Sequence, residues 1–267
     1  MTDDQLLETL LAVAVTAGRA ALDIYRADFT VTQKADRTPV TAADHASEKI
    51  ILERLAQIAP AVPVVAEESA AAGSIPQVGA EFFLVDPLDG TKEFIHRRGE
   101  FTVNIALIRH RMPALGVVYA PVGGVLYWGN VATARAFRCS HPAEAATPGP
   151  REPIRVRPVP STGITAVVSR SHSTPETDAY LSHYAIGDRV SVGSSLKFCL
   201  VAAGEADLYP RLGPTMEWDT AAGHAVLAAA GGRVLAPGGA PLGYGKPDFR
   251  NSFFIASGTL NPVPLAA

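Results

Sequence analysis

Two acidic residues lie three positions apart where a predicted buried strand ends. The apolar run EFFLVD occupies residues 81–86, and Asp86 begins the sequence DPLDGTKEF, which also contains Asp89. Like charges that are held close together repel each other, and burial raises the cost of keeping them ionised. The spacing therefore predicts that a positive group binds between these two carboxylates.

More acidic residues stand at the ends of other predicted elements. Glu67 and Glu68 directly follow the apolar sequence VPVVA, and Asp219 precedes a predicted helix. Asp44 falls in the first turn of a helix predicted over residues 41–59. If these ends converge, they form an oxygen-rich site, and oxygen ligands without a His/Cys cluster suit a hard cation such as Mg²⁺.

Each acidic residue also has an ordinary explanation. Asp44 and Asp219 are typical helix caps, Glu68 is typical of a solvated loop, and DPLDG is typical of a turn. The sequences EE, DPLDGT and WDTAAG occur together in one chain, in this order. The combination favours a metal site over separate caps and turns.

The backbone around DPLDGT adds three features to this site. The carbonyl group of Leu88 can supply a further oxygen ligand, and Gly90 allows a tight turn. Thr91 can begin a helix, and the free N–H groups at a helix N-terminus suit a phosphate. The segment therefore predicts a metal site beside a phosphate site.

The first half of the chain predicts helices followed by a mainly antiparallel sheet. The helices are predicted over residues 4–26 and 41–59, with Thr41 and Asp44 forming a capping box. Strands are predicted at 62–66 and 81–86 and within EFTVNIALI, ALGVVYAP, GVLYWGN and ARAFRC. Short strands at such close spacing are typical of antiparallel pairing.

The Pro- and Ala-rich segment at residues 141–153 is a candidate linker. After it, strands and helices alternate, which indicates a layered α/β unit. We therefore predict an N-terminal α+β metal-binding subdomain over residues 1–150 and a C-terminal α/β substrate-binding subdomain over residues 151–267.

Composition excludes several function classes. The 267 residues carry a net charge of −3, which argues against binding a nucleic acid polymer. No apolar run reaches the roughly 18 residues of a membrane span. The N-terminal leucines fit an amphipathic helix better than a signal peptide, because acidic residues replace the basic start of one. These features predict a cytoplasmic protein, with loose attachment to the inner face of the cell membrane left open.

The ordered motifs resemble a known enzyme family. EE, DPLDGT and WD, together with QKADRTPVTAAD, GEFTVNIALI, SRSH, GSSLKFCLVA and LYPRLGPTMEWDTAAGHAV, extend over nearly the whole chain. They are similar to the inositol monophosphatase superfamily of lithium-sensitive, magnesium-dependent phosphatases. The similarity is greatest to its bacterial CysQ branch, the 3′(2′),5′-bisphosphate nucleotidases. The resemblance implies a layered αβαβα sugar-phosphatase fold with two sheet-containing subdomains.

The resemblance also implies roles for the acidic residues. Thr91 and Asp44 would form a dyad that helps to deprotonate the attacking water, and Glu68 would support the metal shell. Two or three Mg²⁺ ions would separate the carboxylates. The implied metal ligands are Glu67, Asp86, the carbonyl group of Leu88, Asp89 and Asp219.

The second half is expected to recognise the substrate. Ser194 and Lys197 lie at the start of a predicted helix and suit an anion, and Ser169 and His172 follow a strand. By themselves, Ser194 reads as a helix cap and His172 as a surface histidine, whereas the resemblance favours substrate contacts. The predicted substrate-binding set is Glu67, Leu88, Asp89, Gly90, Thr91, Ser169, His172, Gly193, Ser194, Lys197 and Asp219.

The implied reaction is hydrolysis of 3′-phosphoadenosine 5′-phosphate to AMP and phosphate, by a monomer or homodimer. An inositol monophosphatase is the nearest alternative. That group carries an acidic residue seven positions before the aspartate of WD, whereas this chain has Leu212 there. Fructose-1,6-bisphosphatase activity and a non-catalytic phosphonucleotide sensor are weaker alternatives.

Overall fold

A seven-stranded sheet forms the larger part of the computed structural model, which describes residues 1–27, 29–33, 39–169 and 174–265. Its strand order is β3-β4-β5-β6-β7-β8-β9, with β3 parallel to β4 and every other pair antiparallel. The strands are β3 (Val64–Ala66), β4 (Glu81–Asp89), β5 (Thr102–Arg109), β6 (Met112–Ala120), β7 (Val125–Asn130), β8 (Arg135–Ser140) and β9 (Glu152–Ile154).

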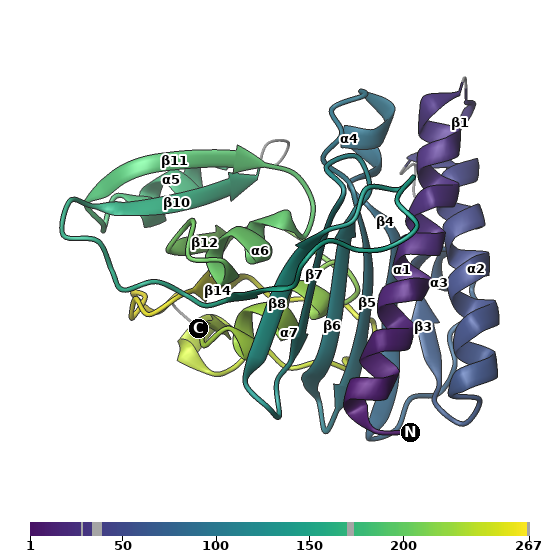
Figure 1. Ribbon diagram of the computed structural model, residues 1–267. Helices are drawn as coiled ribbons and strands as arrows, with labels where there is room; N and C mark the ends of the chain where they lie inside the picture. The colour runs from purple at the N-terminus through teal and green to yellow at the C-terminus, as the bar shows by residue number, and fades with distance from the viewer. Residues whose placement is uncertain (28, 34–38, 170–173, 266–267) are drawn as a thin grey trace.

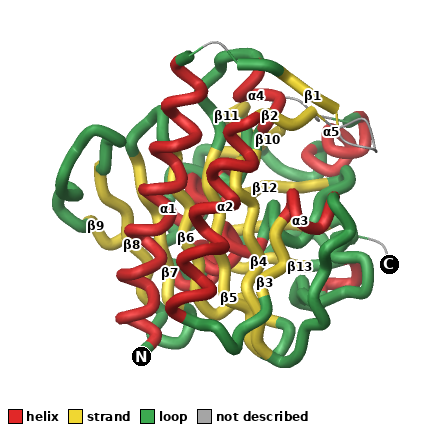
Figure 2. Tube along the Cα trace, turned by 90° about the vertical axis from the view of Figure 1, so that its right-hand side faces the viewer, coloured by secondary structure: helices red, strands yellow, loops and turns green. Residues whose placement is uncertain are grey.

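Helices α1 (Asp3–Arg26) and α2 (Ala42–Ile58) lie side by side on one face of this sheet (Figures 1 and 2). Thr2 and Gln5 form a capping box at the start of α1. The predicted capping box of Thr41 and Asp44 is present at the start of α2. Both helices therefore begin where local hydrogen bonding satisfies their first N–H groups.

Alternation along β4 divides the core into two layers. Phe83 and Val85 pack toward α1 and α2, whereas Phe82 and Leu84 pack in the cluster that contains residues of α6 (Leu196–Ala202) and α7 (Ala221–Ala229). Helix α7 packs against β5, β6 and β7, and a Cβ atom on Gly116 would lie 2.4 Å from the carbonyl oxygen of Ala222. The close approach of α7 to the sheet therefore requires glycine at this position.

The second half forms a five-stranded sheet in the order β11-β10-β12-β14-β13. Its outer face packs against α5 (Pro175–Leu181), and its inner face packs against α6. The layers thus run helix, sheet, helix, sheet, helix, which confirms the predicted αβαβα architecture (Figure 1). The strands are β10 (Ile164–Ser169), β11 (Ile186–Val192), β12 (Leu208–Arg211), β13 (Arg233–Leu235) and β14 (Phe254–Ser257).

Short elements complete the fold. Helices α3 (Glu67–Ala71) and α4 (Thr91–Ile95) follow β3 and β4, and a 3₁₀ turn, η1, spans Pro237–Gly239. Four strands were absent from the sequence prediction: the paired β1 (Val31–Gln33) and β2 (Pro39–Thr41), β9 and β14. Strand β9 follows residue 150 yet pairs with β8 in the first sheet, and the subdomain division at that residue stays a prediction.

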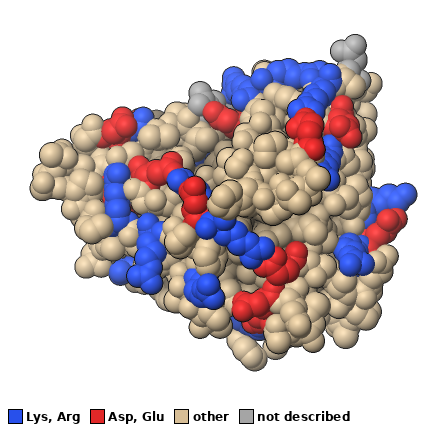
Figure 3. Space-filling view, viewed as in Figure 1, with Lys and Arg blue, Asp and Glu red and all other residues tan. Residues whose placement is uncertain are grey.

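The face drawn in Figure 3 carries both acidic and basic side chains, with a short basic row at the top and further basic side chains at the lower left. Among the described residues, no helix combines the length and the apolar character that crossing a membrane requires.

Candidate active site

Helix α2 directs three polar side chains toward the ends of β3 and β4. Asp44, Ser47 and Glu48 are buried, together with the apolar Ile51 and Leu55. Residues three and four positions apart share one face of a helix, so this buried stripe is polar near the N-terminus and apolar beyond it. The polar part of the stripe faces the predicted metal site.

Ser47 and Glu48 hold the two loops that carry the acidic residues. The Ser47 hydroxyl donates to the carbonyl oxygen of Pro87 at 2.8 Å. The Glu48 carboxylate accepts from the backbone N–H groups of Glu68 and Ser69, each at 2.8 Å. Neither Ser47 nor Glu48 was predicted as a site residue, although their i+3 and i+4 spacing from Asp44 puts them on its face of the helix.

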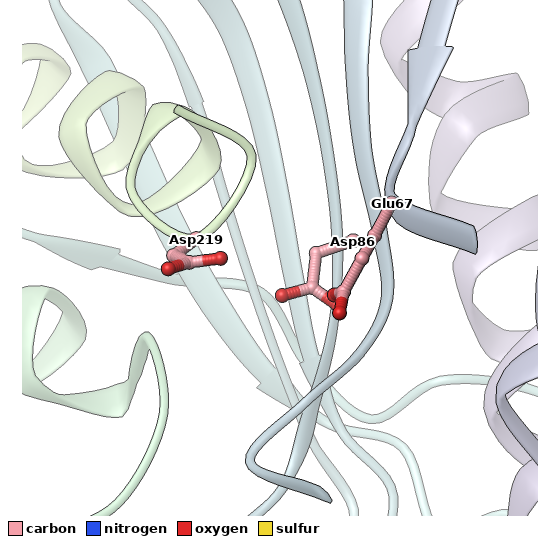
Figure 4. A group of neighbouring side chains, drawn as sticks. All are labelled: Glu67, Asp86 and Asp219. Carbon is pink, nitrogen blue, oxygen red and sulfur yellow. The ribbon is translucent and has the colours of Figure 1, made fainter. Parts of the chain in front are cut away.

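Three of the predicted ligands converge from separate segments. Figure 4 shows Glu67, Asp86 and Asp219 pointing toward one another from α3, β4 and the loop before α7. One carboxylate oxygen of each lies within 4.8 Å of those of the other two. Asp86 is buried, whereas Glu67 and Asp219 are partly exposed.

The electrostatics of this cluster fit a divalent cation. Burial raises the pKa of Asp86 well above its usual range, and the nearby charges of Glu67 and Asp89 raise it further. Burial likewise raises the pKa of Asp219, with added repulsion from Asp89 and Glu67. A hard cation with oxygen ligands removes this repulsion, so the donor set suits Mg²⁺.

The segment after Asp86 places the remaining predicted ligands. The N–H group of Leu88 donates to Oδ1 of Asp86 at 3.0 Å, so that the loop folds back on its own carboxylate. Gly90 caps α4 with φ of 98°, a left-handed conformation that glycine adopts without strain. Burial raises the pKa of Asp89, while Lys197 and the amide of Asn104 lower it.

The predicted dyad is in contact. The Thr91 hydroxyl lies 3.3 Å from Oδ1 of Asp44 and 3.4 Å from the carbonyl oxygen of Leu88. Oδ2 of Asp44 accepts from the N–H group and the hydroxyl of Thr41, both at 2.8 Å. One oxygen of Asp44 is therefore fixed by the capping box, while the other faces Thr91.

Glu68 is the second residue of α3, and its side chain is buried. Among the described residues, the acidic cluster that could hold an ion contains its neighbour Glu67 rather than Glu68. The role of Glu68 in supporting a metal shell stays a prediction.

The loop that carries Asp219 is held by a distant segment. The N–H group of Met216 donates to Oδ2 of Asp219 at 2.8 Å. Glu217 is fully buried, and its carboxylate accepts from the N–H groups of Gly245 and Lys246 at 2.7 and 3.0 Å. Glu217 was not predicted from the sequence, because its partners lie far along the chain.

A cleft of about 270 Å³ opens beside the acidic cluster, between the two halves of the chain. Several predicted substrate-binding residues line it: Glu67, Asp89, Gly90, Thr91, Ser169, Gly193, Ser194, Lys197 and Asp219. Asp86 and Leu88 lie in β4 and are buried. His172 lies outside the described residues.

Two buried cations, Lys197 and Arg211, line the same cleft as the carboxylates. Lys197 donates to the carbonyl oxygen of Ser194, and burial lowers its pKa to about 8. Arg211 donates to the carbonyl oxygen of Pro214 at 2.9 Å, and its buried Nε finds no acceptor among the described residues. Buried charges without full pairing are costly, so these groups are suited to an anionic ligand.

Ser194 and Leu212 bear on two alternatives raised by the sequence: whether Ser194 caps a helix, and whether the site resembles that of an inositol monophosphatase. The Ser194 hydroxyl is buried and finds no partner among the described residues, so it does not cap α6. Leu212 packs in the apolar cluster with residues of α5 and β14, and it is not among the residues that line the cleft. The position that is acidic in inositol monophosphatases is therefore part of the core here.

Comparison with known proteins agrees with this geometry. The 3′(2′),5′-bisphosphate nucleotidase CysQ of Escherichia coli K12 is 46% identical over 257 residues, which cover 93% of this chain and 100% of that protein. The crystal structure of CysQ from Bacteroides thetaiotaomicron matches with a TM-score of 0.80 and 38% identity, covering 96% of this chain and 98% of that one.

A structure of inositol monophosphatase from Anabaena (Nostoc) is more distant, with a TM-score of 0.73 and 27% identity over 96% of this chain and 92% of that one. The model of the inositol monophosphatase family matches residues 2–261. With the fold, the carboxylate cluster and nearly full-length similarity in agreement, this chain belongs to the inositol monophosphatase family.

Proposed function

We propose that this protein is a Mg²⁺-dependent 3′(2′),5′-bisphosphate nucleotidase that hydrolyses 3′-phosphoadenosine 5′-phosphate to AMP and phosphate. One observation carries the proposal: a single cleft combines a converging carboxylate cluster with two buried cations, Lys197 and Arg211. The carboxylates suit a metal-bound phosphate, and the cations suit a second phosphate. The name of the E. coli relative, 46% identical over 257 residues, supports the same substrate class.

Glu67, Asp86, Asp89 and Asp219, with the carbonyl group of Leu88, would hold the metal. Bound Mg²⁺ supplies a Lewis acid that acidifies a water molecule and neutralises charge on the phosphate. We propose two or three ions, because four carboxylates carry more negative charge than one divalent cation balances.

Thr91 and Asp44 would orient the attacking water and accept its proton. The Thr91 hydroxyl can accept a hydrogen bond from water while donating its own proton toward Oδ1 of Asp44. Oδ2 of Asp44 is already satisfied by Thr41, so the capping box holds the carboxylate in place.

Lys197, Arg211 and Ser194 would bind the phosphate that is not cleaved. Each presents a buried polar group at the wall of the cleft. Binding energy from a non-reacting group can position the phosphate that reacts. Leu212, which is buried in the core, leaves this wall without the carboxylate expected to bind inositol hydroxyls.

Phosphate release from a substrate panel tests the proposal. The panel contains 3′-phosphoadenosine 5′-phosphate, 3′-AMP, inositol 1-phosphate and fructose 1,6-bisphosphate, each with Mg²⁺ and with chelator. The Asp219→Asn variant is the control for contaminating phosphatase. We expect the bisphosphonucleotide to have the highest kcat/KM and to require Mg²⁺.

Two outcomes would overturn the assignment. A preference for inositol phosphate would identify the alternative branch of the family. Binding of the bisphosphonucleotide without phosphate release, at any Mg²⁺ concentration, would identify a sensor. The cytoplasmic location and the oligomeric state, monomer or homodimer, stay predictions.

A further inference from the structure

Asn104 is a fully buried amide in the middle of strand β5. Its side-chain Nδ2 lies 3.3 Å from Oδ2 of Asp89 and 3.0 Å from the hydroxyl oxygen of Ser195. Asp89 belongs to the first half of the chain and Ser195 to the second. The amide therefore contacts both halves of the molecule beside the acidic cluster.

Ser195 extends this contact to another predicted ligand. Its hydroxyl donates to the backbone carbonyl oxygen of Asp219 at 2.7 Å. A hydroxyl has one proton, so Ser195 must accept from Asn104 rather than donate to it. This direction turns the NH₂ group of Asn104 toward Ser195, and its second N–H then points to the carboxylate of Asp89.

The arrangement has a cost that an apolar residue would avoid. Oδ1 of Asn104 is buried and has no hydrogen-bond partner among the described residues. An unsatisfied buried polar atom is destabilising, and Ala106 and Ile108, which lie on the same face of β5 as Asn104, show that this face accommodates apolar side chains. A benefit other than stability is therefore expected from the amide.

We infer that Asn104 and Ser195 are positioning residues that together set the separation of Asp89 from Asp219 across the two halves. The inference rests on the proposed metal-dependent function. Asn104 fixes the rotation of the Asp89 carboxylate, and Ser195 fixes the backbone of Asp219. Hydrogen-bonded partners behind metal ligands tune metal affinity, and their loss typically weakens it by about 10–100-fold.

Mn²⁺ binding, followed by electron paramagnetic resonance of the free ion, tests the inference without relying on activity. Asn104→Leu keeps the approximate size but removes the amide, and Ser195→Ala removes the hydroxyl. We expect each variant to bind Mn²⁺ about 10–100-fold more weakly than the wild type. The double variant should lose little more than either single one, because the two side chains act as one bridge.

Two further variants separate positioning from packing. Thr102→Val changes a buried hydroxyl on the same face of β5 that has no partner among the described residues, and it should leave Mn²⁺ affinity unchanged. Ser195→Thr keeps a hydroxyl and should retain most of the affinity lost in Ser195→Ala.

The outcomes are distinct. Wild-type Mn²⁺ affinity in both Asn104→Leu and Ser195→Ala would overturn the inference, even if their thermal midpoints in chelator fall. If the losses of Mn²⁺ affinity in the two single variants multiply in the double variant, Asn104 and Ser195 do not act as one bridge. A wild-type protein that binds no Mn²⁺ would instead overturn the proposed function.

Discussion

Two groups of side chains at the site differ in how they are held: Asp86, Asp89 and Asp219, which we call the carboxylate end, and Lys197 and Arg211, which we call the cation end. Asp86, Asp89 and Asp219 each accept a hydrogen bond from a nearby amide, at 3.0, 3.3 and 2.8 Å. Within the described part of the chain, the hydrogen bonds of Lys197 and Arg211 go only to nearby carbonyl oxygens, and Nε of Arg211 finds no acceptor there. The charge of Asp89 also attracts Lys197.

This difference indicates two kinds of binding. The carboxylates are oriented before any ligand arrives, which suits a metal that is bound in every turnover. The cations keep donor capacity, which would suit a group that enters and leaves with the substrate. Substitutions at the two ends should therefore affect different measured quantities, as the following predictions state.

The largest effect is expected from Asp86→Asn. If Asp86 is a metal ligand as proposed, its loss removes transition-state charge stabilisation worth several kcal/mol, so turnover should fall by about 10⁴-fold. A titration of turnover against Mg²⁺ concentration measures this loss. Near-normal turnover at low Mg²⁺ would show that the carboxylate end does not hold the metal.

The same variant should gain stability when metal is absent. The fold raises the pKa of Asp86, so its carboxyl group favours the folded state at low pH and destabilises it as the pH rises above about 4. In chelator, the wild-type thermal midpoint should fall relative to that of the variant between pH 4 and pH 8. Saturating Mg²⁺ should reverse the order of the two proteins at pH 8.

The second effect concerns the dyad at the carboxylate end. Thr91→Val keeps the bulk of the side chain but removes the proton path, so kcat should fall by about 10²–10⁴-fold. KM should change less, and Thr91→Ser should restore activity because it keeps the hydroxyl. Adding Asp44→Asn to Thr91→Val should cost little more; if the two losses multiply, the residues do not act as one unit.

A smaller effect is expected at the cation end. Lys197→Ala should lower kcat/KM for 3′-phosphoadenosine 5′-phosphate by roughly 10–100-fold, the scale of one charge-assisted contact. The loss should be smaller for 3′-AMP if Lys197 contacts the 5′-phosphate. Equal losses on both substrates would place this lysine beside the ribose or the 3′-phosphate instead.

The pKa of Lys197 adds a pH dependence to this prediction. Because burial lowers that pKa to about 8, the free enzyme loses this positive charge as the pH rises through about 8. The wild-type kcat/KM for the bisphosphonucleotide should fall over that range, whereas Lys197→Arg should fall less. Parallel pH profiles for the two proteins would contradict the assignment.

The smallest effect is expected from Glu48→Gln. The Glu48 side chain holds the backbone directly after Glu67. An uncharged amide keeps one acceptor oxygen but cannot accept from Glu68 and Ser69 with both oxygens, as the carboxylate does. We expect Mg²⁺ affinity to fall by about 10-fold, the lower end of the range for groups behind a metal ligand. Calorimetric Mg²⁺ titration measures it, with Glu53→Gln on the exposed part of the same helix as the control.

The sequence predicted the carboxylate end better than the groups that support it. Asp86, Leu88 and Asp89 are nearly adjacent, so one short motif contains them together with the turn at Gly90. Their ligand types are informative without any knowledge of long-range contacts. The capping box of Thr41 and Asp44 was predictable for the same reason, because its two residues are local partners.

Supporting residues depend on contacts between distant segments. Glu217 accepts a hydrogen bond from the N–H group of Lys246, and Asn104 donates one to Ser195. The local sequence does not distinguish these residues from solvated polar ones. Strand β14 was missed because a four-residue apolar run does not by itself identify a strand. It is placed between β12 and β13 by pairing with residues far earlier in the chain.

Gly116 has no side chain, yet it affects whether the proposed metal ligands lie close enough together to bind an ion. Helix α7 begins two residues after Asp219. It can pack this close to the first sheet only because Gly116 has no side chain. A larger residue there would move α7 outward and carry Asp219 away from Glu67 and Asp86. A homologous sequence can therefore retain every acidic motif and still lose the metal, which makes this sheet glycine a useful criterion for separating active relatives from inactive ones.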